Sequence, residues 1–594
     1  MFGRSSVSGS ALAAWLIAFT AFAHAAPPPT EFDRTPPRLA FVQGDASFLR
    51  EGAQDWTPAL PNTPLARGDR LYTDAAANLE MQIGTRAFLR AGEHTEVGIL
   101  ALEPKFLQVR MGTGHLSLDL RSVDAGHAFE IDTPAGAFTI ARSGYYRIAV
   151  AGDTTTFIAR RGGRATATTA GGKVYEIAPS EQVVFAGAGE PRIESFAAPE
   201  PDPWDRWNFE RSDRLIDSVS ARYVPAGVYG VDDLDHHGDW RVVAEYGPVW
   251  IPRVAAGWAP YGAGTWIHDP DFGWTWVDDA PWGWAPFHYG RWIRIGEFWG
   301  WAPGPIAARQ WYAPALVAFY GLPETSIAVS ITAAPVAWIA LGWGEPCIPW
   351  WGPPAMRGHP HWLGWGGPRI VNDVVVARTR TVRAADIHAY RNAALPGALV
   401  GVPVDRFGRG RLHPVALEHR EFDRLRPIHG ALPLAPTRAS LAPAQGRAKR
   451  PDDAIARRAV VARRALPARV PAPAFAREPD RTPPPRIDPA PVVRLAPMVD
   501  GKAQERLRPP FARGGDRERM PPPQPPRFQG LAAPDAQRGS IPAPAARTER
   551  RASPGPAAAA GQTRRDLPGD PANRVFHGRR DEGTRQRHED GRGR

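Results

Sequence analysis

A repeat of 26 residues constrains the fold of this chain more than any other feature of its sequence. The triplet Gly-x-Trp stands at Gly238–Trp240 and recurs at Gly264–Trp266 and Gly290–Trp292. Eight of the 26 positions are identical between the first two units. A unit of this length cannot bury an apolar face alone, so neighbouring units have to pack on one another. The repeat therefore predicts a scaffold or a surface, and it does not by itself predict an active site.

Each unit of the repeat is predicted to be a β-hairpin. Asp269–Gly273 has the composition of a turn, because its proline fixes φ and its glycine accepts a positive φ. Trp266 and Trp276 lie five residues either side of the centre of this turn, and Trp240 and Trp250 are placed in the same way in the first unit. We therefore expect a cross-strand tryptophan pair in each hairpin and a stack of hairpins.

Eighteen of the 22 tryptophans lie between residues 240 and 365, and two interpretations of them are open. They form the core of a small repeat domain, or some of them form an exposed aromatic platform for sugar rings or a partner protein. The candidates for an aromatic interaction surface are Trp274, Trp282 and Trp299. Trp282 is informative because its counterpart in the first unit is Ala256, so packing common to both units does not require an aromatic side chain there.

Residues 38–196 are predicted to form an all-β domain. Apolar and polar residues alternate in 79–83, 107–111 and 116–120, and glycines interrupt the runs at turn-like intervals. Each such strand has one apolar face, which favours a sandwich or a coiled sheet. Residues 197–228 are then expected to be a linker.

Two motifs of this first domain carry a family resemblance. Gly68-Asp69-Arg70-Leu71-Tyr72-Thr73 and Thr133-Pro134-Ala135-Gly136 resemble elements of the FecR-type domain, in the order of that family. The resemblance implies a periplasmic β-domain, and some members of the family relay signals to a sigma factor. Those regulators have a cytoplasmic segment and a membrane helix ahead of the domain, whereas we expect only a cleavable signal here.

The tryptophan-rich segment closely resembles an uncharacterised family of exported bacterial proteins. The resemblance rests on motifs such as Pro281-Trp282-Gly283-Trp284-Ala285-Pro286 and Leu341-Gly342-Trp343-Gly344-Glu345-Pro346. In that family the segment follows a FecR-type domain and precedes a proline-rich tail. The resemblance implies this architecture and no particular activity. We expect the repeats at 229–303 and a β-rich extension of the repeat domain at 304–429.

The first 25 residues have the pattern of a secretory signal peptide. Arg4 precedes an apolar run at 11–22, and Ala23-His24-Ala25 is a small-x-small cleavage pattern. We expect cleavage after Ala25, a periplasmic or exported protein, and no transmembrane helix in the mature chain, because the apolar run is shorter than the roughly 20 residues that span a bilayer. Cys347 is the only cysteine, which excludes an intrachain disulfide.

Residues 430–594 are predicted to be a disordered basic tail. From residue 431 the chain holds 33 Lys and Arg against 17 Asp and Glu, with 28 prolines and no Trp or Tyr. Such a composition buries too little apolar surface to offset the entropy of ordering. The tail is either a solvated linker or a ligand for polyanions at low salt. The expected partner is an envelope protein or an anionic envelope polymer, with no specific nucleic acid.

Candidate catalytic and metal-binding residues are few. The acidic and histidine-containing segment 232–239 lacks the spacing of a calcium loop and is expected to be a solvated loop. His359 and His361 bind a metal with His288 only if the fold gathers them. Asp278 and its neighbour point to opposite faces of a strand, and no hydrolase or phosphate-binding motif occurs. We expect no catalytic, cofactor or metal site.

The sequence therefore predicts a mainly β, non-enzymatic interaction or scaffold protein of the bacterial cell envelope. Two alternatives stay open, a FecR-like periplasmic sensor and a cell-wall enzyme. Nothing in the sequence indicates the oligomeric state.

Overall fold

The computed structural model is mainly β, as predicted. It describes residues 35–187, 190–304, 306, 310–322, 335–352, 369–371, 374–376, 390–412, 415–416, 424–466, 475–476, 493–496 and 506–510. Within these ranges, no helix has the length and apolar character needed to cross a membrane. The predicted signal peptide, His359, His361 and residues 511–594 lie outside the described residues.

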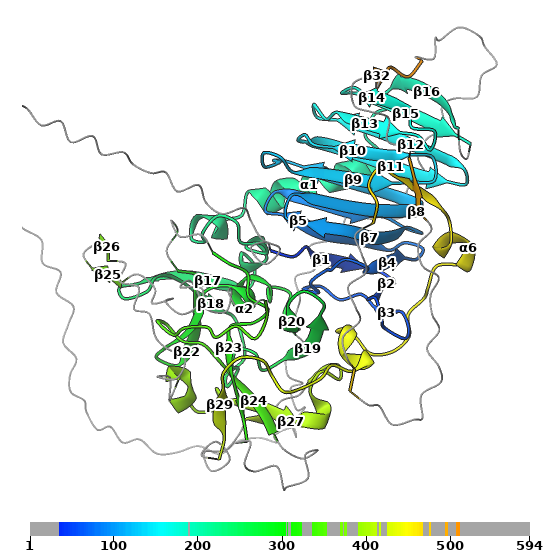
Figure 1. Ribbon diagram of the computed structural model, residues 1–594. Coiled ribbons are helices and arrows are strands. Elements are labelled where there is room, and N and C mark those ends of the chain that lie inside the picture. The colour runs from blue at the N-terminus through cyan, green and yellow to red at the C-terminus, as the bar shows by residue number, and fades with distance from the viewer. Residues whose placement is uncertain are drawn as a thin grey trace, which may run out of the picture. The chain divides into compact units, whose positions relative to one another are not determined.

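The first domain consists of two sheets around one apolar core (Figure 1). Sheet A has the order β1 (Arg38–Gln43), β5 (Asn78–Gly84), β6 (Ala87–Ala91), β8 (Phe106–Leu120), β11 (Gly144–Ala151), β12 (Thr154–Arg160), β15 (Glu181–Ala186) and β16 (Arg192–Ala197). Sheet B has the order β3 (Thr57–Pro58), β2 (Ala46–Leu49), β4 (Arg70–Thr73), β7 (Glu96–Glu103), β8, β9 (Ala128–Asp132), β10 (Ala137–Ile140), β13 (Ala165–Thr168) and β14 (Val174–Ile177). The pairs are antiparallel, except that β8 with β9 and β14 with β32 (Arg506–Leu507) are parallel.

The long strand β8 belongs to both sheets. Its first half pairs with β7 and β9, and its second half, from Gly114 onward, pairs with β6 and β11. Gly114 has a φ of 92°, and an added Cβ would lie 2.3 Å from the Thr95 hydroxyl oxygen, so the crossing point requires glycine. The predicted alternation is confirmed, since Leu107, Val109 and Leu118 point into the shared core.

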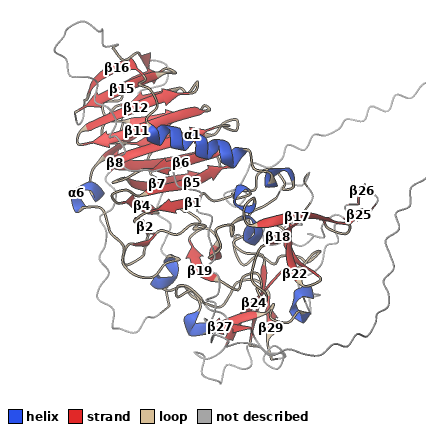
Figure 2. Ribbon diagram, turned by 180° about the vertical axis from the view of Figure 1, so that it is seen from behind, coloured by secondary structure: helices blue, strands red, loops and turns tan. Residues whose placement is uncertain are grey.

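A helix lies within the segment expected to be a linker. α1 (Pro203–Ile216) begins with a capping box formed by Asp202 and Asp205 and has proline at its first position. It lies across the outer face of sheet A (Figure 2), and its Trp204 and Trp207 are buried. The linker prediction for 197–228 is therefore corrected, because α1 is packed against the first domain.

The tryptophan-rich segment forms three hairpins and a five-stranded sheet, which together we call the tryptophan domain. The hairpins are β17 (Gly238–Val243) with β18 (Gly247–Pro252), β19 (Gly264–Asp269) with β20 (Gly273–Asp278), and β21 (Arg291–Ile295) with β22 (Phe298–Ala302). The larger sheet has the order β28 (Val415–Ala416), β27 (Val400–Pro403), β24 (Pro335–Ala340), β23 (Val317–Gly321) and β29 (Arg426–Ile428). Both parts share one aromatic core.

The hairpins do not stack in chain order, which corrects the prediction. The first and third join edge to edge through Trp250 opposite Trp301, and the second forms a sheet of its own. Both edges of the second hairpin are occupied by other segments. The carbonyl of Gly264 accepts from the Leu412 amide at 2.9 Å, and the Trp276 amide donates to the Pro314 carbonyl at 3.0 Å.

The ordered chain extends beyond the predicted boundary at 430. Residues 424–466 are described and include α6 (Asp453–Ala456) and β30 (Val460–Ala462), which pairs in parallel with β31 (Val493–Leu495). We call residues 447–464 the strap, because they run along sheet B beside β8, as the position of α6 in Figure 1 shows. The remaining elements are α2 (Ala285–His288), η2 (Ser220–Arg222), η3 (Asp232–Leu234), η7 (Arg391–Ala394), η8 (Val404–Arg406), η9 (Arg438–Leu441), β25 (Arg369–Val371), β26 (Val374–Val376) and β32 (Arg506–Leu507).

Candidate functional site

The predicted cross-strand tryptophan pairs are confirmed. Trp240 lies opposite Trp250 in the first hairpin, and Trp266 lies opposite Trp276 in the second. The third hairpin repeats the arrangement with Trp292 opposite Trp301. The turn of the second hairpin has its glycine at a positive φ, as predicted, because Gly273 has a φ of 66°. The Asp269 side chain also accepts from the amides of Asp271 and Phe272, at 2.9 and 3.1 Å.

The glycine of each Gly-x-Trp triplet makes room for an indole on the partner strand. A Cβ added at Gly264 would lie 2.5 Å from the Trp276 ring, and one added at Gly238 would lie 2.4 Å from the Trp250 ring. At Gly290 the nearest indole atom would be Nε1 of Trp301, at 2.6 Å. The repeated triplet therefore reflects a packing contact: each triplet glycine lies against the indole ring of the second tryptophan of its own hairpin.

The three tryptophans predicted as an interaction surface are buried. Trp274, Trp282 and Trp299 are 5%, 4% and 6% exposed. Trp274 packs edge-on against Phe407 and donates its Nε1 to the Leu434 carbonyl at 3.1 Å. The structure therefore corrects this prediction: these three indoles are core residues. Segments more than a hundred residues away along the chain cover Trp274.

The neighbours of Trp282 show why it is an aromatic residue. Its ring lies 4.9 Å from that of Trp250 and 5.9 Å from that of Phe287. Trp250 belongs to the first hairpin and Phe287 to α2 of the same unit as Trp282, so Trp282 fills the space between the first hairpin and α2. The absence of an aromatic residue at Ala256 reflects a different position of the first unit in the core, because Ala256 lies in an exposed loop.

A different aromatic pair is only half-buried. Tyr223 stacks on Trp240 with ring centroids 4.8 Å apart and an interplanar angle of 27°. The Trp240 Nε1 donates to the Ser220 hydroxyl at 2.9 Å. Val242, on the same face of β17 as Trp240, is 80% exposed, and Val219 is 51% exposed. We call Val219, Tyr223, Trp240 and Val242 the edge patch.

The edge patch lies on a free strand edge. In the part of the chain that the structure describes, β17 pairs only with β18, so its outer edge joins no strand. A free edge of six residues is a template for pairing with another extended segment. The patch therefore combines exposed apolar area with backbone groups that a partner strand can reach.

The acidic segment 232–239 positions this patch and is not a solvated loop, which corrects the prediction. The two Asp235 carboxylate oxygens accept from the amides of Val219 and Ser220 at 3.0 and 2.9 Å. Asp233 forms an ion pair with the buried Arg38 at 2.7 Å. The segment thus fixes residues 219–220 beside Trp240 and attaches η3 to the first domain.

The cysteine, the histidine and the aspartate that the sequence analysis named occupy packing positions. Burial raises the pKa of the Cys347 thiol to about 12. His288 is buried, with Nδ1 2.8 Å from the Ala313 carbonyl, and burial lowers its pKa to about 3. Burial raises the pKa of Asp278 to about 8, and that carboxyl accepts from Trp276 Nε1 and the Ala280 amide. Among the described residues, no group of three or more His, Cys, Asp or Glu side chains is arranged to hold a metal ion.

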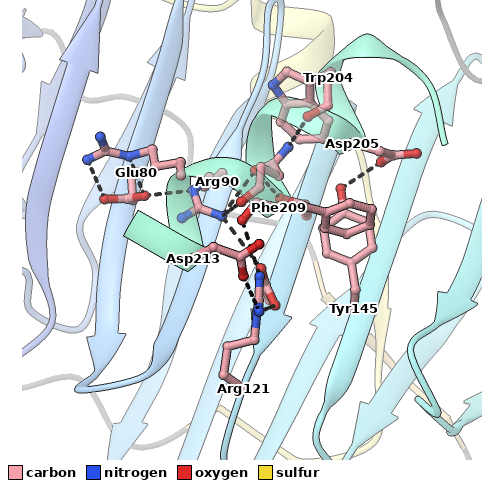
Figure 3. A network of polar contacts seen from close by, with 12 residues as sticks. Glu80, Arg90, Arg121, Tyr145, Trp204, Asp205, Phe209 and Asp213 are labelled. Carbon is pink, nitrogen blue, oxygen red and sulfur yellow. Dashed lines mark hydrogen bonds and ion pairs between the residues drawn. The ribbon is translucent and has the colours of Figure 1, made fainter. Parts of the chain in front are cut away.

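A buried polar network lies between α1 and sheet A (Figure 3). Glu80 accepts from Arg90 Nε at 2.6 Å and from Arg211 of α1 at 2.7 Å. Burial disfavours the charged form of Glu80, but the two guanidinium groups hold its pKa down at about 2. Asn208 Oδ1 accepts from Arg90 at 3.3 Å and from Ser117 at 3.0 Å. A carboxylate that stays charged at neutral pH is suited to holding α1 on sheet A through ion pairs, and it is not suited to proton transfer.

A second part of the network fixes the start of α1. Asp205 accepts from the Tyr145 hydroxyl at 2.6 Å and from Arg147 at 3.0 Å. The Arg147 guanidinium carbon lies 4.4 Å from the ring centroid of Trp204, a cation–π contact. These residues were not predicted from the sequence, although the capping pattern of Asp202 and Asp205 indicates the start of a helix.

The tryptophan-rich segment matches the model of one protein family. A family model described as "Family of unknown function (DUF6600)" matches residues 231–345, which hold the three hairpins and the first two strands of the five-stranded sheet. The match agrees with the expected similarity of this segment to an uncharacterised family. No curated protein matches the chain.

Solved structures give only a distant likeness. Two of the matches are crystal structures described as "a putative anti-sigma factor" from Parabacteroides distasonis ATCC 8503, at 1.65 and 2.50 Å resolution. They share 11% and 12% identity with this chain, and each match spans 22% of this chain and 59% of the other, with a TM-score of 0.19. A TM-score of this size carries no argument, so the FecR-type resemblance of the first domain stays a prediction.

Proposed function

We propose that this protein is a non-enzymatic interaction or scaffold protein of the bacterial cell envelope that binds a partner protein through the edge patch. The observation that carries the proposal is the half-buried stack of Tyr223 on Trp240 beside a free strand edge. Strand addition at such an edge gains affinity from main-chain hydrogen bonds and specificity from side-chain contacts. Aromatic side chains are the commonest energetic centres of such interfaces.

The envelope location of the proposal rests on the signal-like sequence of residues 1–25. An anionic envelope polymer is the alternative partner, and the two classes differ in salt dependence. Apolar burial and strand pairing tolerate salt, whereas charge pairing is screened. Binding through the edge patch is therefore expected to persist at high salt.

The test is cosedimentation of the full mature chain with isolated cell envelopes at low and high salt. The variant is Val242→Lys, which places a charge on the exposed edge of β17 without removing a core contact, since Val242 is 80% exposed. We expect the variant to lose the salt-tolerant binding and to melt like the wild type. Protease treatment of the envelopes should abolish the same binding, because the partner is a protein.

The matched control is Val254→Lys, a second exposed valine of the tryptophan domain, which lies outside the edge patch. This control should bind like the wild type. Unchanged binding of Val242→Lys, or no binding of the wild-type chain at any salt concentration, would remove the edge patch as the site. Release of soluble muropeptides from cell walls by the purified protein would contradict the non-enzymatic role.

A further inference from the structure

The outer face of sheet B carries charged and polar side chains that are fully buried, and we call these side chains the floor. Arg110 forms an ion pair with Glu96 at 2.6 Å, and Gln108 donates to Asp132 at 2.7 Å. All four side chains have an exposed fraction of 0%. Side chains of this kind are almost never fully buried unless they are paired and covered. The cover over this floor is the strap.

The strap binds this floor through its backbone, as an extended ligand does. The Val461 amide donates to the Thr133 carbonyl at 2.9 Å, and the Arg463 amide donates to Glu130 at 2.9 Å. Arg110, part of the floor, donates to the Arg458 carbonyl at 3.0 Å. Main-chain hydrogen bonds of this spacing are typical of a peptide held against a sheet.

Residues 457–464 of the strap also bury apolar side chains at their centre. Val460, Val461 and Ala462 are 0%, 1% and 0% exposed. Basic side chains flank this apolar centre on both sides. Arg458 donates to the Gly152 carbonyl at 3.1 Å, and Arg464 pairs with Glu103 at 3.3 Å.

The contacts at the ends of the strap are those of a releasable segment. Arg464 and Glu103 are 52% and 42% exposed, and Arg447, paired with Asp55, is 77% exposed. Exposed pairs of this kind contribute little and are screened by salt. α1 contrasts with the strap, because its pairs with sheet A, such as Arg211 with Glu80, are 16% and 0% exposed.

We propose that the outer face of sheet B is a binding groove for an extended basic polypeptide with a small apolar centre, and that residues 457–464 of this chain are its resident ligand. Arg464 pairs with Glu103 at the rim, the Arg463 amide donates to Glu130 of the floor, and the Val-Val-Ala centre is fully covered. The groove is separate from the edge patch. Part of the positive charge of the C-terminal region is thus directed at the chain's own first domain.

The test uses the full mature chain and a labelled synthetic peptide with the sequence of residues 457–464. Val461→Asp should release the strap, because it places a charge where the wild-type side chain is 1% exposed. Leu495→Asp is the matched control, because Leu495 lies in the neighbouring β31 and is 54% exposed. In hydrogen exchange, the Val461 and Arg463 amides should be protected in the wild type and the control.

In the released variant, we expect these amides to exchange at least about tenfold faster. The peptide should bind the released variant and bind the wild type at least about tenfold more weakly, because the resident strap competes. A peptide carrying the same Val461→Asp change should bind neither chain. Peptide binding should weaken as salt rises.

A second release variant guards against unfolding of the first domain by the buried aspartate. The double change Arg463→Glu and Arg464→Glu reverses flanking charges and leaves the apolar centre intact. It should change amide exchange and peptide binding in the same direction as Val461→Asp, because it places a negative charge at position 464 beside Glu103. The proposal is overturned if a folded released chain does not bind the peptide, or if the strap amides of the wild type exchange as fast as those of the released variants.

Discussion

At the scale of single residues, glycine and tryptophan act as complementary shapes. Gly264 leaves the space that the Trp276 indole occupies, and the same pairing joins Gly238 to Trp250. Trp276 is fully buried and anchored by a hydrogen bond from its Nε1 to Asp278 at 2.9 Å. The indole therefore cannot move aside for an additional methyl group.

Gly264→Ala should accordingly destabilise the tryptophan domain. The added Cβ would meet the Trp276 ring and the Val277 carbonyl oxygen at 2.5 Å, and overpacking of this kind costs about 1–3 kcal/mol. Urea unfolding followed by tryptophan fluorescence measures the loss. The control is Gly273→Asn, at a turn position with a φ of 66° and open space around its Cβ, where asparagine is tolerated.

A fall of less than about 0.5 kcal/mol for Gly264→Ala would mean that the hairpin relaxes around the methyl group, in the range of ordinary surface substitutions. That result would contradict the steric explanation of the repeat.

The tryptophan pairs were predictable because register follows from local spacing around a turn. The burial of Trp274 was not, because its cover comes from Phe407 and the Leu434 carbonyl, more than 130 residues away. The edge patch was missed for the same reason. Its Tyr223 lies outside the repeat, and only the fold brings it onto Trp240.

At the scale of elements, the polar faces of both sheets are covered by segments from elsewhere in the chain. Alternation in strands such as 107–111 correctly predicted an apolar face toward the core. It did not reveal that the opposite faces are covered, by α1 on sheet A and by the strap on sheet B. A polar residue on a strand is normally predicted to face solvent. The partners of Arg90 and Arg110, Asn208 and the Arg458 carbonyl, are too far away along the chain to be inferred from sequence spacing.

Asn208 is the residue of α1 on which this cover can be tested. Its side-chain oxygen accepts from Arg90 and Ser117, and its nitrogen donates to the Trp204 carbonyl. Asn208→Ala leaves buried donors without their partner, which costs about 1–3 kcal/mol. We expect a matching loss in the unfolding free energy of the first domain.

Glu210→Ala is the control for this prediction, because Glu210 lies on the exposed face of the same helix. Equal stabilities of the two variants would show that α1 rests on sheet A without contributing to its stability.

At the scale of the whole molecule, buried polar contacts join the first domain to the tryptophan domain. Arg50 pairs with Asp69 of its own domain at 2.9 Å and lies 3.4 Å from Asp269 of the second hairpin. The Asn62 side chain donates to the carbonyl of Ala280 at 2.8 Å and to that of Asp278 at 3.3 Å. The linker expected between the domains is thus replaced by direct contact.

The carboxyl of Asp278 makes the stability of this junction depend on pH. Its pKa is raised from 3.8 to about 8 by burial, so between these values the folded chain holds a proton that the unfolded chain has released. Stability is therefore lost as pH rises through this window, by at most about 1.4 kcal/mol per pH unit. The lowered pKa of buried His288 makes stability increase as pH rises, but only below pH 6.5, so it does not affect the range above that pH.

We expect the unfolding free energy of the wild type to fall between pH 6.5 and 8 relative to that of Asp278→Asn, which does not titrate. Chemical denaturation of both chains at these two pH values is the measurement. Parallel pH profiles would show that Asp278 is already ionised in the folded protein.

The position of the strap in the chain has a consequence for biosynthesis. α1 follows directly after β16, so a growing chain can cover sheet A as soon as the first domain is complete. The strap begins at residue 447, which is 231 residues after the end of α1 at Ile216, so it is made after the entire tryptophan domain. Until then, and in any product that stops before residue 457, the charged floor of sheet B faces water with Arg110 and Gln108 uncovered. Before residues 457–464 are made, the outer face of sheet B is therefore accessible to other extended chains. Once they are made, the strap covers this face.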